Sequence, residues 1–329
     1  MFRREKSLML FGLDADRYSL KGVWLFLFVY LGATLFAAIT TAPAYWFVEW
    51  VHSISPSDTT RWLLGKNMDV YFDRMRWVPI IVGLPWVLSK CGLFSASNLG
   101  IRLSLSSLKT AARYFLLGLL LAGIIFSLQY MFADVSPKGG ISGGDLIGIL
   151  VNAILGGAII GFLEELVFRG LIMRTIYTAA TPWAAVLLSS LFFAYKHFKV
   201  PDSVWSHLPG GLHNPSWDIG FFIAYYDAIG ISENFAPVNF ASLAMFGMVL
   251  CMVYIRTKTL LAPVALHCAL VFMIQAYRSV FDIGQCEAVK YFGNAGMTNG
   301  IVPLTLLTLI FVWLVFSQKK SESGKSGAA

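Results

Sequence analysis

Long runs without a single charged residue are the feature that most constrains how this sequence can fold. A helix that crosses a bilayer needs ~20 consecutive, mostly apolar residues, and each run is close to that length or longer. An eighth and weaker candidate, residues 77–99, is interrupted only by Lys90. The seven uncharged runs are residues 22–48, 114–133, 146–163, 175–195, 234–255, 259–277 and 291–318.

The composition agrees with a chain that crosses a membrane many times. Hydrophobic residues make up 57% of the sequence and charged residues only 13%, against roughly 25% charged residues in soluble domains. Since unpaired backbone groups are costly in lipid, each span is expected to be a helix. The sequence therefore predicts an all-α, polytopic membrane bundle of about eight transmembrane helices. We expect one domain over residues 22–318, a cytoplasmic N-terminal segment (1–21) and a polar C-terminal tail (319–329).

The net charge of +7 fits this topology. With the N-terminus inside and eight spans, fifteen Lys and Arg residues fall on the inner side and nine on the outer side. Positively charged loops are normally cytoplasmic, so both termini are predicted to be cytoplasmic. The basic charge then needs no nucleic-acid partner, and the expected surroundings are a lipid bilayer. No cleavable signal peptide is evident, and the compact loops favour a prokaryotic plasma membrane.

The stretch GAIIGFLEELVFRGLIMRT, residues 157–175, brings two adjacent carboxylates into an apolar run. An ionisable residue inside a span costs roughly 2.5–3.5 kcal/mol on insertion scales, so Glu164 and Glu165 are functional candidates. A simpler explanation is that the two acids mark a helix end, with Glu165 and Arg169 as a structural pair at i,i+4.

A count of residues places a histidine at the depth of Glu164. Thr181 and Pro182 are typical of a helix start, so the fourth and fifth helices are expected to form a hairpin that turns near residue 180. Glu164 and His197 each lie about sixteen residues from this turn, or ~24 Å along a helix. The two side chains can then share a water molecule, with the carboxylate as general base and acid, or form a structural polar pair.

Two further side chains extend this set. Phe193 precedes His197 by four residues and shares its helix face, and His267 lies well inside the seventh run. Each histidine has a simpler explanation. Lys196 and Lys199, which flank His197, are typical of a helix end at the membrane interface. A lone buried histidine such as His267 is often a core residue whose hydrogen bonds are made within the protein. Three helices that each offer one ionisable group are nevertheless a recurring way to build a site in a bundle.

Three motifs taken together resemble a known family. EELVFR matches Glu-Glu-x-x-x-Arg, FAYKH matches Phe-x-x-x-His, and LLAPVALHCALV matches a histidine in an apolar helix after a Leu-x-x-Pro approach. Their order and spacing resemble the CAAX prenyl endopeptidase and bacteriocin-processing (CPBP) family of glutamic-type intramembrane proteases, over roughly residues 146–278. The resemblance implies cleavage of a peptide bond in a membrane-associated protein or peptide, without a cofactor.

The resemblance also implies a role for each matching residue. Glu164 would be the general base, His197 its partner on the water, and His267 the donor to the oxyanion. The remaining matching residues would support the site. The second acid and the arginine would form a pair, and the phenylalanine would pack beneath the site. These supporting residues are Glu165, Arg169 and Phe193.

One position departs from the family pattern. The family has an asparagine four residues after the third-motif histidine, and this sequence has Val271 there, which cannot donate a hydrogen bond. Losing one oxyanion donor typically costs ~2.7–4 kcal/mol of transition-state stabilisation. Gln275 and Ser190 are possible substitutes. The departure also leaves open a non-proteolytic member that binds a peptide or lipid, such as an immunity protein.

Other chemistries find weaker support in the sequence. Ser142, in GGISGG, is similar to the rhomboid Gly-x-Ser pattern, with His267 as its base. Asp145 and Asp227 faintly resemble presenilin-type aspartyl proteases, in reversed order and with Asp227 expected in a loop.

Metal chemistry has little support either. The metalloprotease motif His-Glu-x-x-His is absent, and four scattered cysteines without CxxC predict no zinc frame. Glu164, His197 and His267 could bind zinc by residue type alone. We therefore predict no metal or cofactor, with zinc not excluded.

Overall fold

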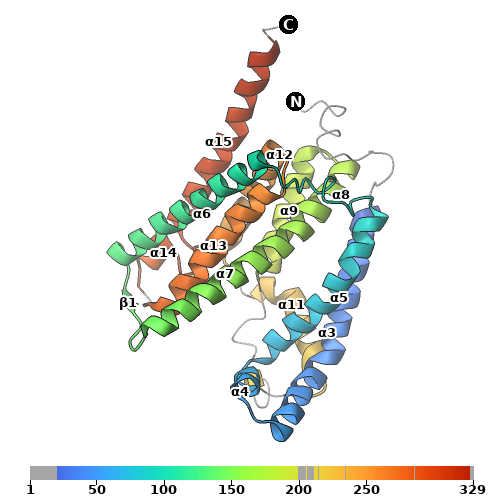
Figure 1. The fold of residues 1–329 in the computed structure, drawn as a ribbon, viewed down its shortest axis with the longest axis vertical. Coiled ribbons are helices and arrows are strands. Elements are labelled where there is room, and N and C mark those ends of the chain that lie inside the picture. The colour runs from blue at the N-terminus through green and yellow to red at the C-terminus, as the bar shows by residue number, and fades with distance from the viewer. Residues whose placement is uncertain are drawn as a thin grey trace. The chain divides into compact units, whose positions relative to one another are not determined.

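The computed structural model describes residues 21–198, 205, 211–213, 215–233, 235–284 and 286–326. Most of these residues lie in helices (Figure 1). The predicted N-terminal segment, up to residue 20, and the end of the polar tail from residue 327 lie outside the described residues.

The chain divides into two compact units. Among the described residues, the first unit comprises those within 92–194 and 236–326, and the second comprises those within 21–91 and 195–235. The predicted division into one transmembrane domain between two terminal segments stays a prediction.

The prediction of an all-α polytopic membrane protein is confirmed. In the described part of the chain, five helical stretches are long and apolar enough to cross a membrane. The other three predicted spans lie on shorter or less apolar helices, so the count of eight stays a prediction. The five long stretches are α3 (Lys21–Ile54), α6 (Leu105–Phe132), Gly143–Tyr177, α12 (Pro237–Thr257) and α13 (Leu261–Val280). The other three predicted spans lie on α5 (Met68–Lys90), α9 (Pro182–Lys196) and α15 (Ile301–Ser326).

In the first unit, α13 lies between α6 and α7 (Gly143–Glu165) and packs on both (Figure 1). Glycines allow these close approaches. A Cβ atom on Gly118 of α6 would lie 2.9 Å from the Leu266 carbonyl oxygen, and one on Gly157 of α7 would lie 2.9 Å from the Cys268 carbonyl oxygen. α15 packs on α12. The backbone of α13 is therefore fixed from two sides, which holds its side chains in register with those of α7.

The loops at one end of the first unit form a small cap. β1 (Val135–Pro137) pairs antiparallel with β2 (Phe281–Ile283), so the chain segments that follow α6 and α13 are joined. A short helix, α14 (Val289–Phe292), precedes α15. Gln129 donates from its side-chain amide to the carbonyl oxygens of Phe292 and Gly293, at 3.0 and 2.9 Å.

The hairpin turn predicted near residue 180 occurs where the sequence places it. Helix α8 (Met173–Ala179) ends one residue before that position, and α9 begins at Pro182. The Thr181 hydroxyl accepts a hydrogen bond from the Ala184 backbone N–H at 3.2 Å, which satisfies one of the unpaired donors at the helix start.

The second unit contains α3, α4 (Asp58–Leu64), α5, the 3₁₀ turn η2 (Gly211–His213) and α11 (Ile219–Glu233). Its core is formed by small and aromatic side chains of α3, α5 and α11, among them Ala37, Phe72 and Ile223. Residues 217–230 form an apolar patch in the sequence. In the structure most of this patch is helix α11, which packs on α3.

A buried charge network ties the second unit together. Asp227, on α11, accepts hydrogen bonds from Arg76 at 2.6 Å and from Lys196 at 2.9 Å, both at its Oδ2 atom. The other terminal nitrogen of Arg76 donates to Asp73 at 2.7 Å. Within the second unit the network joins α5 and α11 to Lys196. It also shows that Asp227 lies on a helix rather than in the expected loop.

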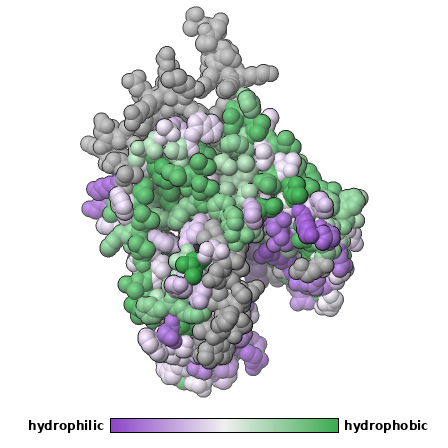
Figure 2. All heavy atoms as spheres, turned by 180° about the vertical axis from the view of Figure 1, so that it is seen from behind, coloured by the Kyte–Doolittle hydropathy of each residue, from purple (hydrophilic) through white to green (hydrophobic). Residues whose placement is uncertain are grey.

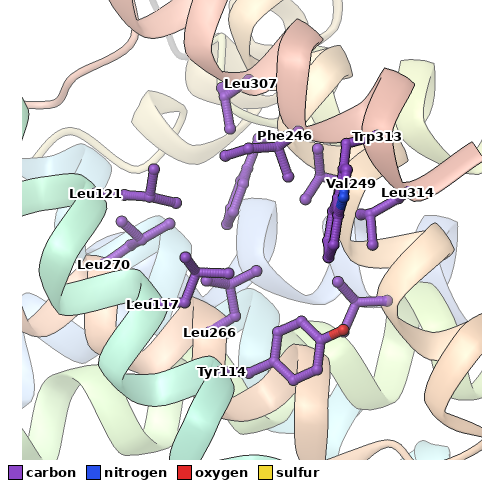
Figure 3. A pocket seen from close by; sticks show the side chains of 12 residues that line it. Tyr114, Leu117, Leu121, Phe246, Val249, Leu266, Leu270, Leu307, Trp313 and Leu314 are labelled. Atoms are coloured by element: carbon purple, nitrogen blue, oxygen red, sulfur yellow. The ribbon is translucent and has the colours of Figure 1, made fainter. Parts of the chain in front are cut away.

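The surface of the molecule is strongly apolar. Figure 2 shows hydrophobic residues over most of the visible face, with hydrophilic residues in smaller areas. On α7 the exposed side chains include Ile147, Ile154 and Ile159. Exposed aliphatic side chains along a long helix are typical of a surface in contact with lipid, because lipid imposes no penalty on apolar exposure.

Candidate active site

The buried face of α7 determines which of the two adjacent carboxylates enters the protein interior. Its buried residues Ala153, Gly157, Gly161 and Glu165 recur every four positions, which places them on one face. This face packs against α13, and Glu165 continues it with no exposed surface. Glu164 lies one position round the helix, and 19% of its side chain is exposed.

A π-helical turn follows directly after the two acids. The segment Leu166–Ile172 has π geometry between α7 and α8 and contains Arg169. Such π turns are rare and occur frequently at functional sites. Arg169 is buried and donates to Glu165 Oε1 at 2.7 Å and to the Gly247 carbonyl oxygen of α12 at 3.0 Å. The ion pair expected from the i,i+4 spacing is therefore present, and it also connects to α12.

His267 of α13 completes the cluster. Its Nδ1 atom lies 2.9 Å from Glu165 Oε1, and its Nε2 atom lies 3.9 Å from Glu164 Oε2. The ring is buried and makes edge contacts with the rings of Phe193, at 6.0 Å, and Phe246, at 5.2 Å. The first and third sequence motifs therefore meet, through a contact between Glu165 and His267 that the sequence reading did not predict.

The partners of Glu165 determine how the imidazole is oriented. A carboxylate that pairs with an arginine is ionised and can only accept hydrogen bonds. The Nδ1 atom of His267 must then carry the proton in its contact with Glu165. Its Nε2 atom faces Glu164 Oε2 across 3.9 Å, too far for a direct hydrogen bond. This nitrogen is an acceptor in the neutral ring and a donor in the imidazolium form.

Two carboxylate oxygens in this cluster are buried without a hydrogen-bond partner among the described residues. They are Oε2 of Glu164 and Oε2 of Glu165. Buried polar atoms are nearly always paired, so an exception in a protein interior calls for an explanation such as catalysis or bound water. In the described part of the chain, Glu164 forms no ion pair with a lysine or arginine. It is the more available of the two acids.

A family comparison agrees with the location of this cluster. Residues 146–273 match the family described as type II CAAX prenyl endopeptidase, Rce1-like. The family resemblance drawn from the motifs is confirmed. No curated protein and no solved structure matches the chain. The matched family is one of proteases, so the match supports protease chemistry in this membrane protein. The match does not identify the catalytic residues.

Phe193 and Ser190 lie on α9 within the Rce1-like stretch, and both are buried. The Phe193 ring contacts His267 and lies 4.8 Å from the guanidinium carbon of Arg169, measured to the ring centroid. Ser190 lies against Gly247, where a Cβ atom would come within 2.9 Å of the serine Cβ. Gly247 thus accepts the Arg169 hydrogen bond on one side and allows α9 to approach on the other.

Gln275 is placed differently. Its side-chain amide lies against Gly156 of α7, where a Cβ atom would be 2.8 Å from Nε2 of the glutamine. Gly156 precedes Glu164 by two helical turns, or ~12 Å along the axis. An oxyanion donor has to lie at the level of the carboxylate, so the position of Gln275 does not suit that role. Val271, one turn after His267, is half-buried.

His197 directly follows the last residue of α9 and belongs to the second unit. Its neighbour Lys196 takes part in the charge network of that unit through Asp227. The pairing of His197 with Glu164 stays a prediction from the sequence.

The serine-protease alternative does not fit the structure. Ser142 is the N-cap of α7, where its hydroxyl bonds to Asp145 Oδ2 at 2.6 Å. Glu165, which contacts His267, lies at the other end of the same helix, ~35 Å away along the axis. A nucleophile and its base must be within hydrogen-bond reach, so Ser142 and His267 cannot form that pair.

The aspartyl-protease alternative also loses support. Asp145 closes a capping box with Ser142, and Asp227 is held by Arg76 and Lys196. Among the described residues, no three His, Cys, Asp or Glu side chains are grouped to hold a metal ion. The expectation that no metal or cofactor takes part stays a prediction.

Proposed function

We propose that this protein is a glutamate-dependent intramembrane endopeptidase that hydrolyses a peptide bond in a membrane-associated protein or peptide. The observation that carries the proposal is the cluster of Glu164, Glu165, Arg169 and His267, buried between α7 and α13 of a membrane protein and inside the Rce1-like stretch. The cluster combines an oriented imidazole and a carboxylate that pairs with no lysine or arginine among the described residues.

The two acids have separate tasks in this proposal. Glu165 is bound by Arg169 and holds the His267 ring through Nδ1, so it acts as a positioning residue. Glu164, which forms no ion pair with a lysine or arginine in the described part of the chain, is the general base. The distance of 3.9 Å between its Oε2 and Nε2 of His267 is too long for a direct hydrogen bond and is compatible with a water that contacts both atoms.

The proposed reaction follows from these positions. Glu164 takes a proton from water as its oxygen attacks the carbonyl carbon of the substrate. The oxyanion that forms accepts a hydrogen bond from Nε2–H of His267 in its imidazolium form. Glu164 then returns the proton to the leaving nitrogen as the peptide C–N bond breaks. The sequence motif alone assigns His197 a further contact with this water.

The experiment that tests the proposal is cleavage of a quenched library of membrane peptides by purified protein in liposomes. Wild-type protein should cleave equally well in the presence and absence of a chelator. The Glu164→Gln variant should not cleave in either case. Loss of activity on chelation would indicate a metal site instead. A fully active Glu164→Ala variant would refute the proposal.

Val271 favours one alternative function, a member of the family that binds a peptide or lipid without cleaving it. The family's asparagine is missing there, so the cluster has one oxyanion donor fewer. This alternative predicts that a well-folded wild-type protein cleaves no peptide, while its binding or immunity function survives Glu164→Ala.

A further inference from the structure

A second polar site lies at the capped end of the first unit, away from the carboxylates. A cavity of about 280 Å³ opens between the cap strands, the end of α13 and the loop after α14. Its polar lining side chains are Lys138, Arg278, Asp282 and Asn294. None of them belongs to the three sequence motifs or to the proposed catalytic cluster.

Two cationic side chains converge on this cavity. The Nζ atom of Lys138 donates to the Arg278 carbonyl oxygen at 2.7 Å, which brings the ammonium group to the end of α13. The Arg278 guanidinium reaches across to the loop after α14, where a Cβ atom on Gly296 would lie 2.9 Å from Nη2. A side chain at Gly296 would press on the guanidinium, so the glycine keeps that space open.

The positive charge in the cavity is only partly neutralised. Asp282 lies 3.6 Å from Lys138, and 70% of its side chain is exposed. Among the described residues, no side chain forms a hydrogen bond or ion pair with the Arg278 guanidinium. Among the residues that line the cavity, Lys138 and Arg278 against the single carboxylate of Asp282 leave a net positive charge. A guanidinium with free N–H groups is suited to bidentate binding of phosphate or carboxylate oxygens.

The location of the cavity identifies the level of the membrane at which it lies. Three membrane-spanning helices have an end here, since α6 ends at Phe132, α13 ends at Val280 and α7 begins at Gly143. Exposed aromatic side chains surround the same cap, including Tyr130 and Tyr291. Aromatic residues at the ends of membrane helices are typical of the lipid headgroup region.

We propose that the cavity bounded by Lys138, Arg278 and Asn294 binds the phosphate group of an anionic phospholipid. A phosphate placed there accepts hydrogen bonds from the guanidinium of Arg278 and the ammonium of Lys138, and basic pockets at the ends of membrane helices are suited to headgroups. The same phosphate chemistry is available from free phosphate in solution. The position at the headgroup level favours the lipid.

The test measures lipid retained by the purified full-length protein in nanodiscs of phosphatidylglycerol or phosphatidylcholine, by native mass spectrometry. We expect tight retention of phosphatidylglycerol by the wild type and at least a tenfold loss in Arg278→Gln. The matched control is Lys290→Gln, which removes an exposed cation that pairs with Glu287 in the same cap. It should retain lipid as the wild type does.

A second variant, expected to raise lipid retention rather than lower it, tests the proposal if Arg278→Gln folds poorly. Asp282→Asn removes the neutralising carboxylate, so retention of phosphatidylglycerol should increase. A third arm titrates the delipidated protein with inorganic phosphate. Saturation by phosphate as tight as that by lipid would make free phosphate the ligand and overturn the lipid assignment. Equal lipid retention by wild type, Arg278→Gln and Asp282→Asn would refute the site altogether.

Discussion

Glu164 and Glu165 are adjacent in sequence and differ in what surrounds them. Glu165 lies on the buried, glycine-lined face of α7 and contacts both Arg169 and His267. Glu164 contacts neither at hydrogen-bond distance. The i,i+4 spacing of Glu165 and Arg169 allows their pairing to be predicted from sequence. The contact between Glu165 and His267 joins residues 102 positions apart, and no local pattern predicts it.

Removing the positive partner of Glu165 should destabilise the protein strongly. Arg169→Ala leaves a fully buried carboxylate without its arginine partner and a carbonyl of α12 without its donor. Breaking a buried ion pair in this way costs about 3–5 kcal/mol, measured as the change in the free energy of unfolding in detergent. The control is Arg61→Ala, which removes an exposed ion pair with Asp58. This variant should lower the free energy of unfolding by less than about 1 kcal/mol. Equal effects of the two variants would contradict the structural role of Arg169.

Val271 offers a test by gain of function. An asparagine there stands one turn after His267, on the same side of α13, and can donate a second hydrogen bond to the oxyanion. Because one such donor is worth ~2.7–4 kcal/mol in other enzymes, Val271→Asn should raise kcat by at least tenfold in the peptide-cleavage assay. Val271→Leu, which adds volume without a donor, should not. A Val271→Asn variant that cleaves no faster than wild type would show that position 271 does not contribute to stabilisation of the oxyanion.

At the scale of helices, the contact between α7 and α13 depends on glycine. A Cβ atom on Gly161 would lie 2.7 Å from the Cys268 sulfur and 2.9 Å from its backbone nitrogen, which forces the helices apart. Gly161→Ala should therefore destabilise by about 1–3 kcal/mol and lower the cleavage rate, because it shifts His267 relative to Glu165. Gly148→Ala on the same helix meets no atom within 4 Å and should be neutral or stabilising by up to ~1 kcal/mol. Thermal unfolding of both variants measures this difference in stability. Equal unfolding temperatures would contradict the predicted role of Gly161.

The charge network of the second unit makes a separate prediction. Asp227→Ala removes the only carboxylate among the described residues that bonds to both Arg76 and Lys196. Two largely buried cations then lose a partner, so the free energy of unfolding should fall by about 3–5 kcal/mol. Glu287→Ala, which breaks an exposed pair with Lys290, is the control. An Asp227→Ala variant as stable as this control would show that the network is dispensable.

Some elements were beyond prediction for physical reasons. The π turn that carries Arg169 has the same apolar composition as the α-helix around it, and hydrophobic pattern does not distinguish the two. The residue count that set Glu164 and His197 at equal depth assumes an unbroken α-helix, and the π turn lies within that count. The strands β1 and β2 have three residues each, too few for an alternating pattern.

For the molecule as a whole, the uncharged runs were sufficient to predict the fold class. Every run coincides with most of a helix, because lipid leaves the backbone few other ways to satisfy its polar groups. The number of spans is less certain, since α9 has 15 residues and α5 carries Arg74 and Arg76 within its length. The two compact units could not be predicted, because each combines segments distant in sequence.

The central claim is that one acid performs the chemistry and its neighbour holds the site together. The most direct test measures the peptide-cleavage rate and the unfolding temperature of Glu164→Gln and Glu165→Gln in the same liposome preparation. We expect Glu164→Gln to lower the rate by roughly 10²–10⁴-fold, the usual contribution of a general base, with an unchanged unfolding temperature. Glu165→Gln should lower both quantities. A Glu164→Gln variant that unfolds as the wild type does and cleaves at the wild-type rate would contradict the account.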